Sequence, residues 1–124
     1  MESTLEISPN GTKIWRNARK QWHREDGPAY EANGNKEWCQ NNLLHREDGP
    51  AVEWANGNQE YWLNGKRHRT DGPAIILSDG YVEYWINGVK HDTLPSHMIS
   101  PNKPSIKEII FQPIITKRYI ELED

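Results

Sequence analysis

The chain has 124 residues and a formal net charge of −3, from 15 basic and 18 acidic side chains. This balance lacks the basic footprint of a nucleic-acid-binding protein and disfavours docking on an anionic membrane. Cys39 is the single cysteine, which excludes an internal disulfide, and no apolar run is long enough for a signal peptide or a membrane span. We therefore expect a cytoplasmic protein.

Apolar surface is concentrated in a few large side chains. Hydrophobic residues make up 35% of the chain, yet 6 Trp and 5 Tyr are among them. Average globular proteins hold about 45–50% apolar residues, Gly included. This composition favours a thin sheet with two solvent-facing sides over a thick sandwich.

A seven-residue motif recurs along the chain. HREDGPA stands at 23–29 and 45–51, HRTDGPA follows at 68–74, and a stub remains at His91-Asp92. The intervals between the motif histidines are 22, 23 and 23 residues. A fixed period of this length is typical of a repeat array. We predict an array of about four units over residues 1–92, the first one irregular, and a non-repeat tail over 93–124.

Each unit holds two turn signals. The first set is Asn10-Gly11, Asn33-Gly34, Asn56-Gly57 and Asp79-Gly80, and the second is Asn41-Asn42, Asn64-Gly65 and Asn87-Gly88. Asn-Gly and Asp-Gly favour two-residue type I′ hairpin turns, in which both central residues need a positive φ. Short runs of β-branched and aromatic residues lie between these turns and predict strands: Ala51–Ala55, Glu60–Leu63, Ala74–Leu77 and Tyr81–Ile86. The fold class is thus mainly β, an antiparallel β-hairpin repeat array.

Two columns of residues follow from strand alternation. The first column holds the aromatic side chains four residues after each first turn, Trp15, Trp38, Tyr61 and Tyr84. The second column lies one residue later and faces the other side of the sheet: Arg16, Cys39, Trp62 and Trp85. We expect the first column to face the core and the second to form a contact surface.

The tail abandons the period. Ser105 to Glu108 fits a helix capping box, so a short helix is expected to about Gln112, where Pro113 ends it. Ile114–Leu122 is β-branched and fits either a last strand or a short helix. We expect the tail to pack on the sheet or cap its open edge.

The unit from Tyr61 to Ala74, with its copies, is similar to the MORN-like repeat family, and in particular to the HREDGPA-type variant seen in phage and giant-virus proteins. The resemblance covers about Leu5 to Asp92. It implies an elongated, twisted sheet of β-hairpins that acts by holding other molecules, and a related branch is antitoxin-like. The usual Gly-x-Gly spacing is replaced by Asp-Gly-Pro, which removes the basis for a lipid-binding role.

The repeated motif does not favour a metal site or a catalytic site. Successive histidines of such an array lie roughly 9–10 Å apart, whereas ligands of one ion lie near 2 Å from it. Acid–base pairs of His and Asp would exist in three equivalent copies, and no nucleophile recurs beside them. We expect no enzyme activity, no cofactor and no metal.

A structural role for the motif explains it better. The residues concerned are His23, Asp26, His45, Asp48, His68 and Asp71. We expect each Asp to accept backbone hydrogen bonds within its own turn, each Gly to supply an unusual backbone angle, and Pro to fix the exit. We expect His and Arg to bond to the next copy as a ladder.

The candidate partner-binding residues lie on the contact surface: Trp54, Trp62, Trp85, Glu60 and Glu83. Aromatic side chains at the centre of an interface carry most of its energy. The favoured function is a non-enzymatic protein-binding module. The resemblance to the HREDGPA-type repeats of phage and giant-virus proteins implies, more narrowly, a phage-encoded inhibitor that occludes a host defence or regulatory protein. The alternatives are an antitoxin-like partner of a toxin, a small-ligand binder that uses exposed Trp, and a structural part of a virion. The array is also compatible with a homo-oligomer.

Overall fold

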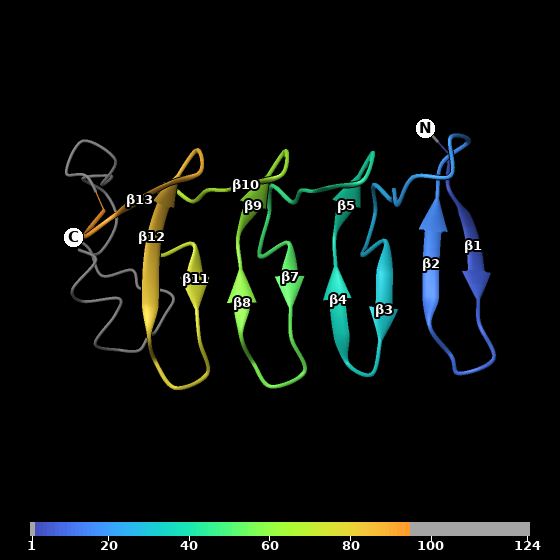
Figure 1. The fold of residues 1–124 in the computed structure, drawn as a ribbon, viewed down its shortest axis with the longest axis horizontal. Helices are drawn as coiled ribbons and strands as arrows, with labels where there is room; N and C mark the ends of the chain where they lie inside the picture. The colour runs from blue at the N-terminus through green and yellow to red at the C-terminus, as the bar shows by residue number, and fades with distance from the viewer. Residues whose placement is uncertain (1, 95–124) are drawn as a thin grey trace.

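A single layer of antiparallel β-strands makes up the described part of the computed structural model, residues 2–94. Figure 1 shows the hairpins side by side in one row, with the strand nearest the N-terminus at one end. The predicted tail helix and last strand lie outside the described residues. Within those residues, no helix is long and apolar enough to cross a membrane.

The strands are short and follow the predicted period. They are β1 (Thr4–Ile7), β2 (Lys13–Arg16), β3 (Tyr30–Ala32), β4 (Asn35–Glu37), β5 (Cys39–Gln40), β6 (Leu43–Leu44), β7 (Val52–Glu53), β8 (Gln59–Glu60), β9 (Trp62–Leu63), β10 (Lys66–Arg67), β11 (Ile75–Ile76), β12 (Val82–Ile86) and β13 (Val89–His91). Nine of them form one sheet in the order β1-β2-β3-β4-β7-β8-β11-β12-β13, and β5-β6 and β9-β10 form two small hairpins. The main sheet follows chain order without a crossover, so the prediction of an antiparallel hairpin array is confirmed.

The predicted strand over Glu60–Leu63 is broken at Tyr61, because this residue belongs to two sheets. Its N–H donates to the carbonyl of Ala74 in the main sheet (2.7 Å), whereas its carbonyl accepts from the N–H of His68 in the small hairpin (3.1 Å). Trp38 divides its unit between β4 and β5 in the same way. In these two units the first-column aromatic residue therefore marks a bend, and the second hairpin projects along one edge of the array (Figure 1). Trp15 and Tyr84, in contrast, lie within the unbroken strands β2 and β12.

The two sets of turns differ in type. In the second set both central residues have positive φ, as at Asn64 (49°) and Gly65 (79°). In the first set only Asn33-Gly34 does so, and the type I′ prediction is wrong for Asn10, Asn56 and Asp79. The loops at Asn10, Asn56 and Asp79 each hold one residue more than the loop at Asn33-Gly34. In each of the three, only the Gly adopts a positive φ, as at Gly57 (96°). A type I turn followed by a Gly bulge explains this, since the N–H of Gly57 donates to the Trp54 carbonyl (2.9 Å).

The first unit carries a similar bulge in its second turn. Lys20 stands at φ 67°, and the N–H of Lys20 donates to the Asn17 carbonyl (2.9 Å). The Asn17 side chain is buried and accepts from the N–H groups of Arg19 and Gln21. The extra residue of this unit is thus absorbed in the turn, so the irregular unit still joins the sheet.

Strand register assigns the residues to two faces. Glu37 lies opposite Val52, which lies opposite Glu60, and the row continues through Ile75 to Glu83. Trp62 and Trp85 lie two residues beyond their Glu neighbours on this side, which we call the Trp–Glu face. The opposite side carries the first-column aromatic residues, and we call it the motif face.

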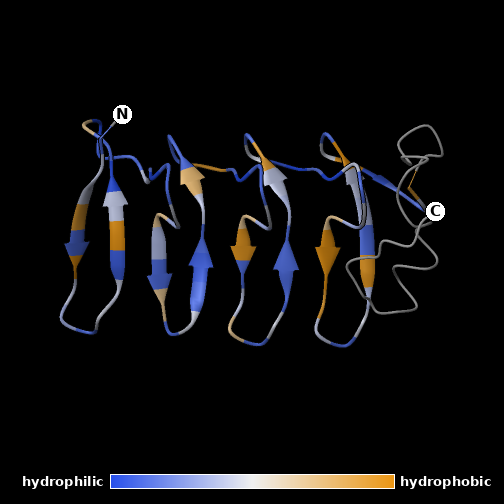
Figure 2. Cartoon of the chain, turned by 180° about the vertical axis from the view of Figure 1, so that it is seen from behind, coloured by the Kyte–Doolittle hydropathy of each residue, from blue (hydrophilic) through white to orange (hydrophobic). Residues whose placement is uncertain are grey.

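Buried side chains are divided between the two faces. On the motif face, alanines that are 0% exposed lie between the first-column aromatic residues, namely Ala29, Ala51 and Ala74. The Trp–Glu face buries Val52, Ile75 and Cys39. The prediction that the first column alone faces the core is therefore too narrow. Figure 2 shows the apolar β11 beside the polar β8 in a single layer of strands.

Candidate partner-binding surfaces

The HREDGPA motif forms a loop that folds its own Arg over the first-column ring. The Arg46 guanidinium carbon lies 3.9 Å from the centroid of the Trp38 ring. Arg46 Nε donates to Asp48 Oδ1 (2.8 Å), and Nη1 donates to the Pro50 carbonyl (3.0 Å). The same side chain therefore makes a cation–π contact, an ion pair and a loop-closing hydrogen bond.

The other two copies repeat this arrangement. Arg24 lies 3.9 Å from the ring centroid of Trp15, and Arg69 lies 4.1 Å from that of Tyr61. Their Nε atoms pair with Asp26 (3.0 Å) and Asp71 (2.9 Å). The Arg side chains also reach the next unit, as predicted. Arg46 Nη1 donates to Glu53 Oε2 in β7 (3.3 Å), and Arg24 Nη1 lies 3.7 Å from Glu31 Oε2 in β3. The Arg46 backbone N–H adds a further connection, with the Trp62 carbonyl (3.1 Å).

The motif Gly acts differently from the prediction, and the motif Asp has an additional role. The main partner of the Asp48 carboxylate is Arg46, whose hydrogen bond and charge lower the pKa of Asp48, and a backbone hydrogen bond at Asp48 itself lowers it further. Gly27, Gly49 and Gly72 are not among the residues with positive φ. A Cβ on Gly49 would lie 2.9 Å from Arg46 Cζ, so the Gly makes room for the guanidinium group. Packing against Arg, rather than backbone freedom, explains the residue type.

The motif histidines form the predicted ladder. His45 Nδ1 accepts from the backbone N–H of Asn64 in the next unit (3.0 Å). The other two pairs are His23 with Asn41 (3.1 Å) and His68 with Asn87 (2.9 Å). This geometry requires an Nδ1 without a proton, so each imidazole carries its proton on Nε2.

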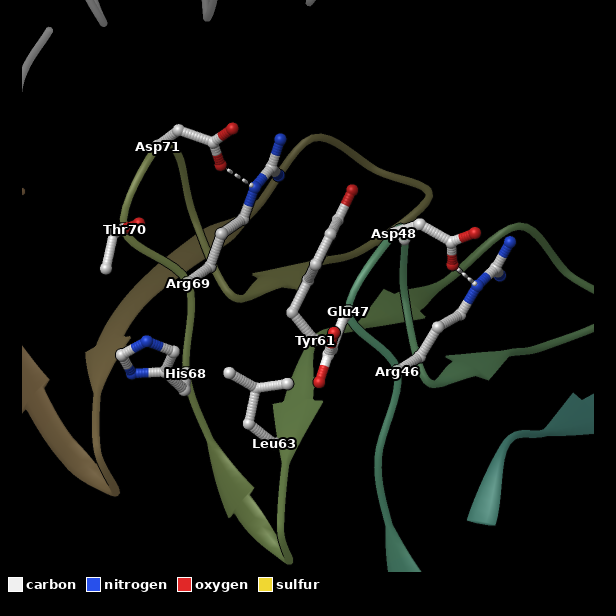
Figure 3. A pocket seen from close by; sticks show the side chains of 10 residues that line it. Arg46, Glu47, Asp48, Tyr61, Leu63, His68, Arg69, Thr70 and Asp71 are labelled. Atoms are coloured by element: carbon white, nitrogen blue, oxygen red, sulfur yellow. Dashed lines mark hydrogen bonds and ion pairs between the residues drawn. The ribbon is translucent and has the colours of Figure 1, made fainter. Parts of the chain in front are cut away.

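Successive motif loops leave grooves between them. One groove of about 400 Å³ is lined by loop residues 46–49 and 68–71, with Tyr61 and Leu63 between the loops. Figure 3 shows Tyr61 standing between the Arg46–Asp48 pair and the Arg69–Asp71 pair. An equivalent groove of about 600 Å³ lies one unit earlier, between loop residues 24–28 and 45–48.

Two kinds of reactive site bear on the described residues, a metal-ligand cluster and a reactive thiol. Within residues 2–94, no group of three or more His, Cys, Asp or Glu side chains could hold a metal ion. Burial, together with the charge of Glu37, raises the pKa of the Cys39 thiol to about 12. A buried thiol that stays protonated at neutral pH is a poor nucleophile.

The predicted partner-binding residues form two clusters on the Trp–Glu face. In the first, the Glu60 carboxylate accepts from the indole N–H of Trp62 (2.9 Å) and from that of Trp54 (3.0 Å). In the second, the Glu83 carboxylate accepts from the Trp85 indole N–H (2.8 Å) and from the Tyr81 hydroxyl (2.9 Å). We call these two clusters together the aromatic strip.

Arg67 joins the two clusters. Its guanidinium carbon lies 5.3 Å from the Trp62 ring centroid and 4.9 Å from that of Trp85. Arg67 Nε is buried and has no hydrogen-bond partner, so the side chain is held by the two rings. Trp62 and Trp85 are half-buried, whereas Trp54 is 39% exposed and Tyr81 49% exposed.

Equivalent carboxylates differ along the Trp–Glu face. The hydrogen bonds from Trp85 and Tyr81 lower the pKa of Glu83. At Glu37 the next residue but one is Cys39, and burial, with the charge of Glu60, raises the pKa. Hydrogen-bond donors thus lower the pKa at Glu83, whereas burial raises it at Glu37.

Sequence reasoning missed Arg67 and Tyr81 as parts of the strip, and the motif arginines as lids over the first column. The Arg that follows every motif His was a sequence signal that could have predicted the contacts with the first-column rings. No sequence signal pointed to Arg67, because Trp22 and Leu44 occupy its position in the earlier units. Comparison of the chain with family models, with curated proteins and with solved structures finds no match.

Proposed function

We propose that this chain is a non-enzymatic protein-binding module, whose rigid β-repeat sheet covers a surface of a partner protein. The supporting observation is the aromatic strip. Its indole N–H groups are held by Glu60 and Glu83, and its inner rings are held by Arg67. A contact surface that is ordered before binding loses little side-chain entropy when the partner docks. Trp54 and Tyr81, at the exposed ends of the strip, are the anchors.

The finer version of the proposal rests on the resemblance of the repeat to the HREDGPA-type, MORN-like variant of phage and giant-virus proteins. On that basis the partner is a host defence or regulatory protein in the cytoplasm, and the mechanism is occlusion. No cofactor, nucleic acid or membrane takes part.

Affinity purification tests this function. The tagged chain is expressed in a bacterial host, and proteins that co-purify in stoichiometric amounts are identified by mass spectrometry. The variant Trp54→Ala with Tyr81→Ala removes both anchors. Leu5→Ala with Ile7→Ala is the matched control, since these side chains are also exposed but lie at the far end of the array.

We expect one protein to co-purify with the unmodified chain and with the control variant, but not with the anchor variant. Circular dichroism must show the same fold for all three proteins. A partner retained by the anchor variant contradicts the role of the strip, and the absence of any partner contradicts the host-protein version.

A further inference from the structure

The two grooves of the motif face are copies of one site. The first is lined by loop residues 24–28 and 45–48, with Trp38 and Gln40. In the second, loop residues 46–49 and 68–71 take the same places, with Tyr61 and Leu63. A ligand group that fits one groove therefore finds a second, equivalent groove one unit away. The grooves share a wall, because Glu47 and Asp48 line both.

Carboxylates outnumber guanidinium groups in both grooves. The first is lined by two Arg and by four carboxylates, Glu25, Asp26, Glu47 and Asp48. The second is lined by two Arg and by three carboxylates, Glu47, Asp48 and Asp71. The Arg side chains are already engaged with the motif Asp and the Pro carbonyls. Carboxylates exceed guanidinium groups by two in the lining of the first groove and by one in that of the second, and this excess favours a cationic ligand. The Glu47 side chain, which both grooves share, is 81% exposed.

The spacing of the grooves selects a backbone conformation for that ligand. Neighbouring units are two strands apart, which places equivalent grooves about 9–10 Å from each other. A polyproline II segment advances about 9.3 Å in the three residues of one turn, and every third side chain points the same way. A β-strand does not match, since its residues i and i+3 face opposite sides.

We propose that the groove row binds a polyproline II segment of a partner protein with Arg or Lys at every third position, one cationic side chain in each groove. The Trp38 and Tyr61 rings offer apolar surface to the aliphatic stems and to intervening Pro. The carboxylates at the groove walls bind the cationic heads. The site lies on the face opposite to the aromatic strip and does not depend on the proposed function of that strip.

A pair of peptides of identical composition tests the spacing. One is a fluorescent (Arg-Pro-Pro)₃ peptide, and the other holds the same residues with its Arg separated by two and by four positions. Titration is followed by fluorescence anisotropy at low salt. The in-register peptide is expected to bind the full chain one to one, at least about fivefold more tightly than its isomer, the equivalent of one surface ion pair.

Two substitutions at equivalent positions test the site. Thr70 occupies in the third motif the place of Glu25 and Glu47, so the fold accepts both residue types there. Glu47→Thr is expected to weaken the in-register peptide about fivefold, and Thr70→Glu to strengthen it by a similar factor. Glu6→Thr, which removes the same charge from β1, is the control and leaves the affinity unchanged.

Three results overturn the proposal. Equal binding of both peptides shows that only net charge is sensed. Equal weakening by Glu47→Thr and Glu6→Thr excludes the grooves as the site. No saturation up to about 1 mM peptide excludes useful recognition. Because Thr70→Glu is expected to increase affinity, a loss of folding cannot imitate the predicted result.

Discussion

His45 Nδ1 accepts a hydrogen bond from the backbone N–H of Asn64, 3.0 Å away in the next unit. The following turn residue completes the contact, since the N–H of Gly65 donates to the Leu44 carbonyl (2.9 Å). Both N–H groups of a type I′ turn are thereby bonded to the preceding unit. The turn that closes the second hairpin of one unit therefore also joins that unit to the preceding one.

His45→Ala is therefore expected to lower the free energy of unfolding by about 1 kcal/mol, the usual loss for one hydrogen bond. Urea unfolding followed by Trp fluorescence measures it. The control is His91→Ala, at the end of the array, where no next turn exists among the described residues. Equal losses in the two variants would contradict an inter-unit role for the His45 side chain.

Gly49→Ala is expected to destabilise the protein by about 1 kcal/mol, because the new Cβ would lie 2.9 Å from Arg46 Cζ and displace the guanidinium group from Trp38. The φ of Gly49 is not positive, so the backbone accepts Ala. A double-mutant cycle with Arg46→Ala checks the cause. The cost of Gly49→Ala should vanish in that background, and an unchanged cost would point to the backbone.

Cys39 is expected to resist thiol reagents in the folded protein. Burial raises the pKa of this thiol to about 12, so almost no thiolate exists at pH 8. Labelling with a chromogenic disulfide at pH 8 should be slow in buffer and fast in denaturing urea. Fast labelling of the folded chain would show that the second hairpin opens readily.

Glu37→Gln is expected to stabilise the fold at pH 7. The pKa of Glu37 is raised in the folded state, so above that pKa the folded protein carries a charge that the unfolded chain holds more easily. The gain should disappear below the ordinary Glu value of 4.5, where both states are protonated. Unfolding curves at pH 7 and pH 4 measure the difference.

Glu83→Gln provides the opposite sign at the equivalent position. The Trp85 and Tyr81 hydrogen bonds lower the pKa of Glu83, so its charge stabilises the fold above 4.5 and this contribution is lost as the pH falls. Glu83→Gln is expected to destabilise at pH 7. If both Gln variants shifted stability in the same direction, the opposite pKa shifts of Glu37 and Glu83 would not explain their effects on stability.

The period, the hairpin order and the residues of both columns were predictable from the sequence, because they depend on local turn chemistry and strand alternation. Asn64-Gly65 shows this well, since two residues that tolerate positive φ suffice to define a type I′ turn. Asn56-Gly57 shows the limit. The same dipeptide there forms a bulged turn, because one additional residue lies between the paired strand positions.

By itself, the sequence determined that this protein is an array of antiparallel hairpins with a 23-residue period, and it pointed to Trp62 and Trp85 as one column. Only the tertiary structure decided how the units join and which rings the Arg guanidinium groups contact. The bend at Tyr61, the His45 ladder and the Arg67 contact each connect neighbouring units. The His45 and Arg67 side chains meet groups 19 and 18 residues further along the chain, Asn64 and Trp85, and no local pattern of residue types specifies which groups meet.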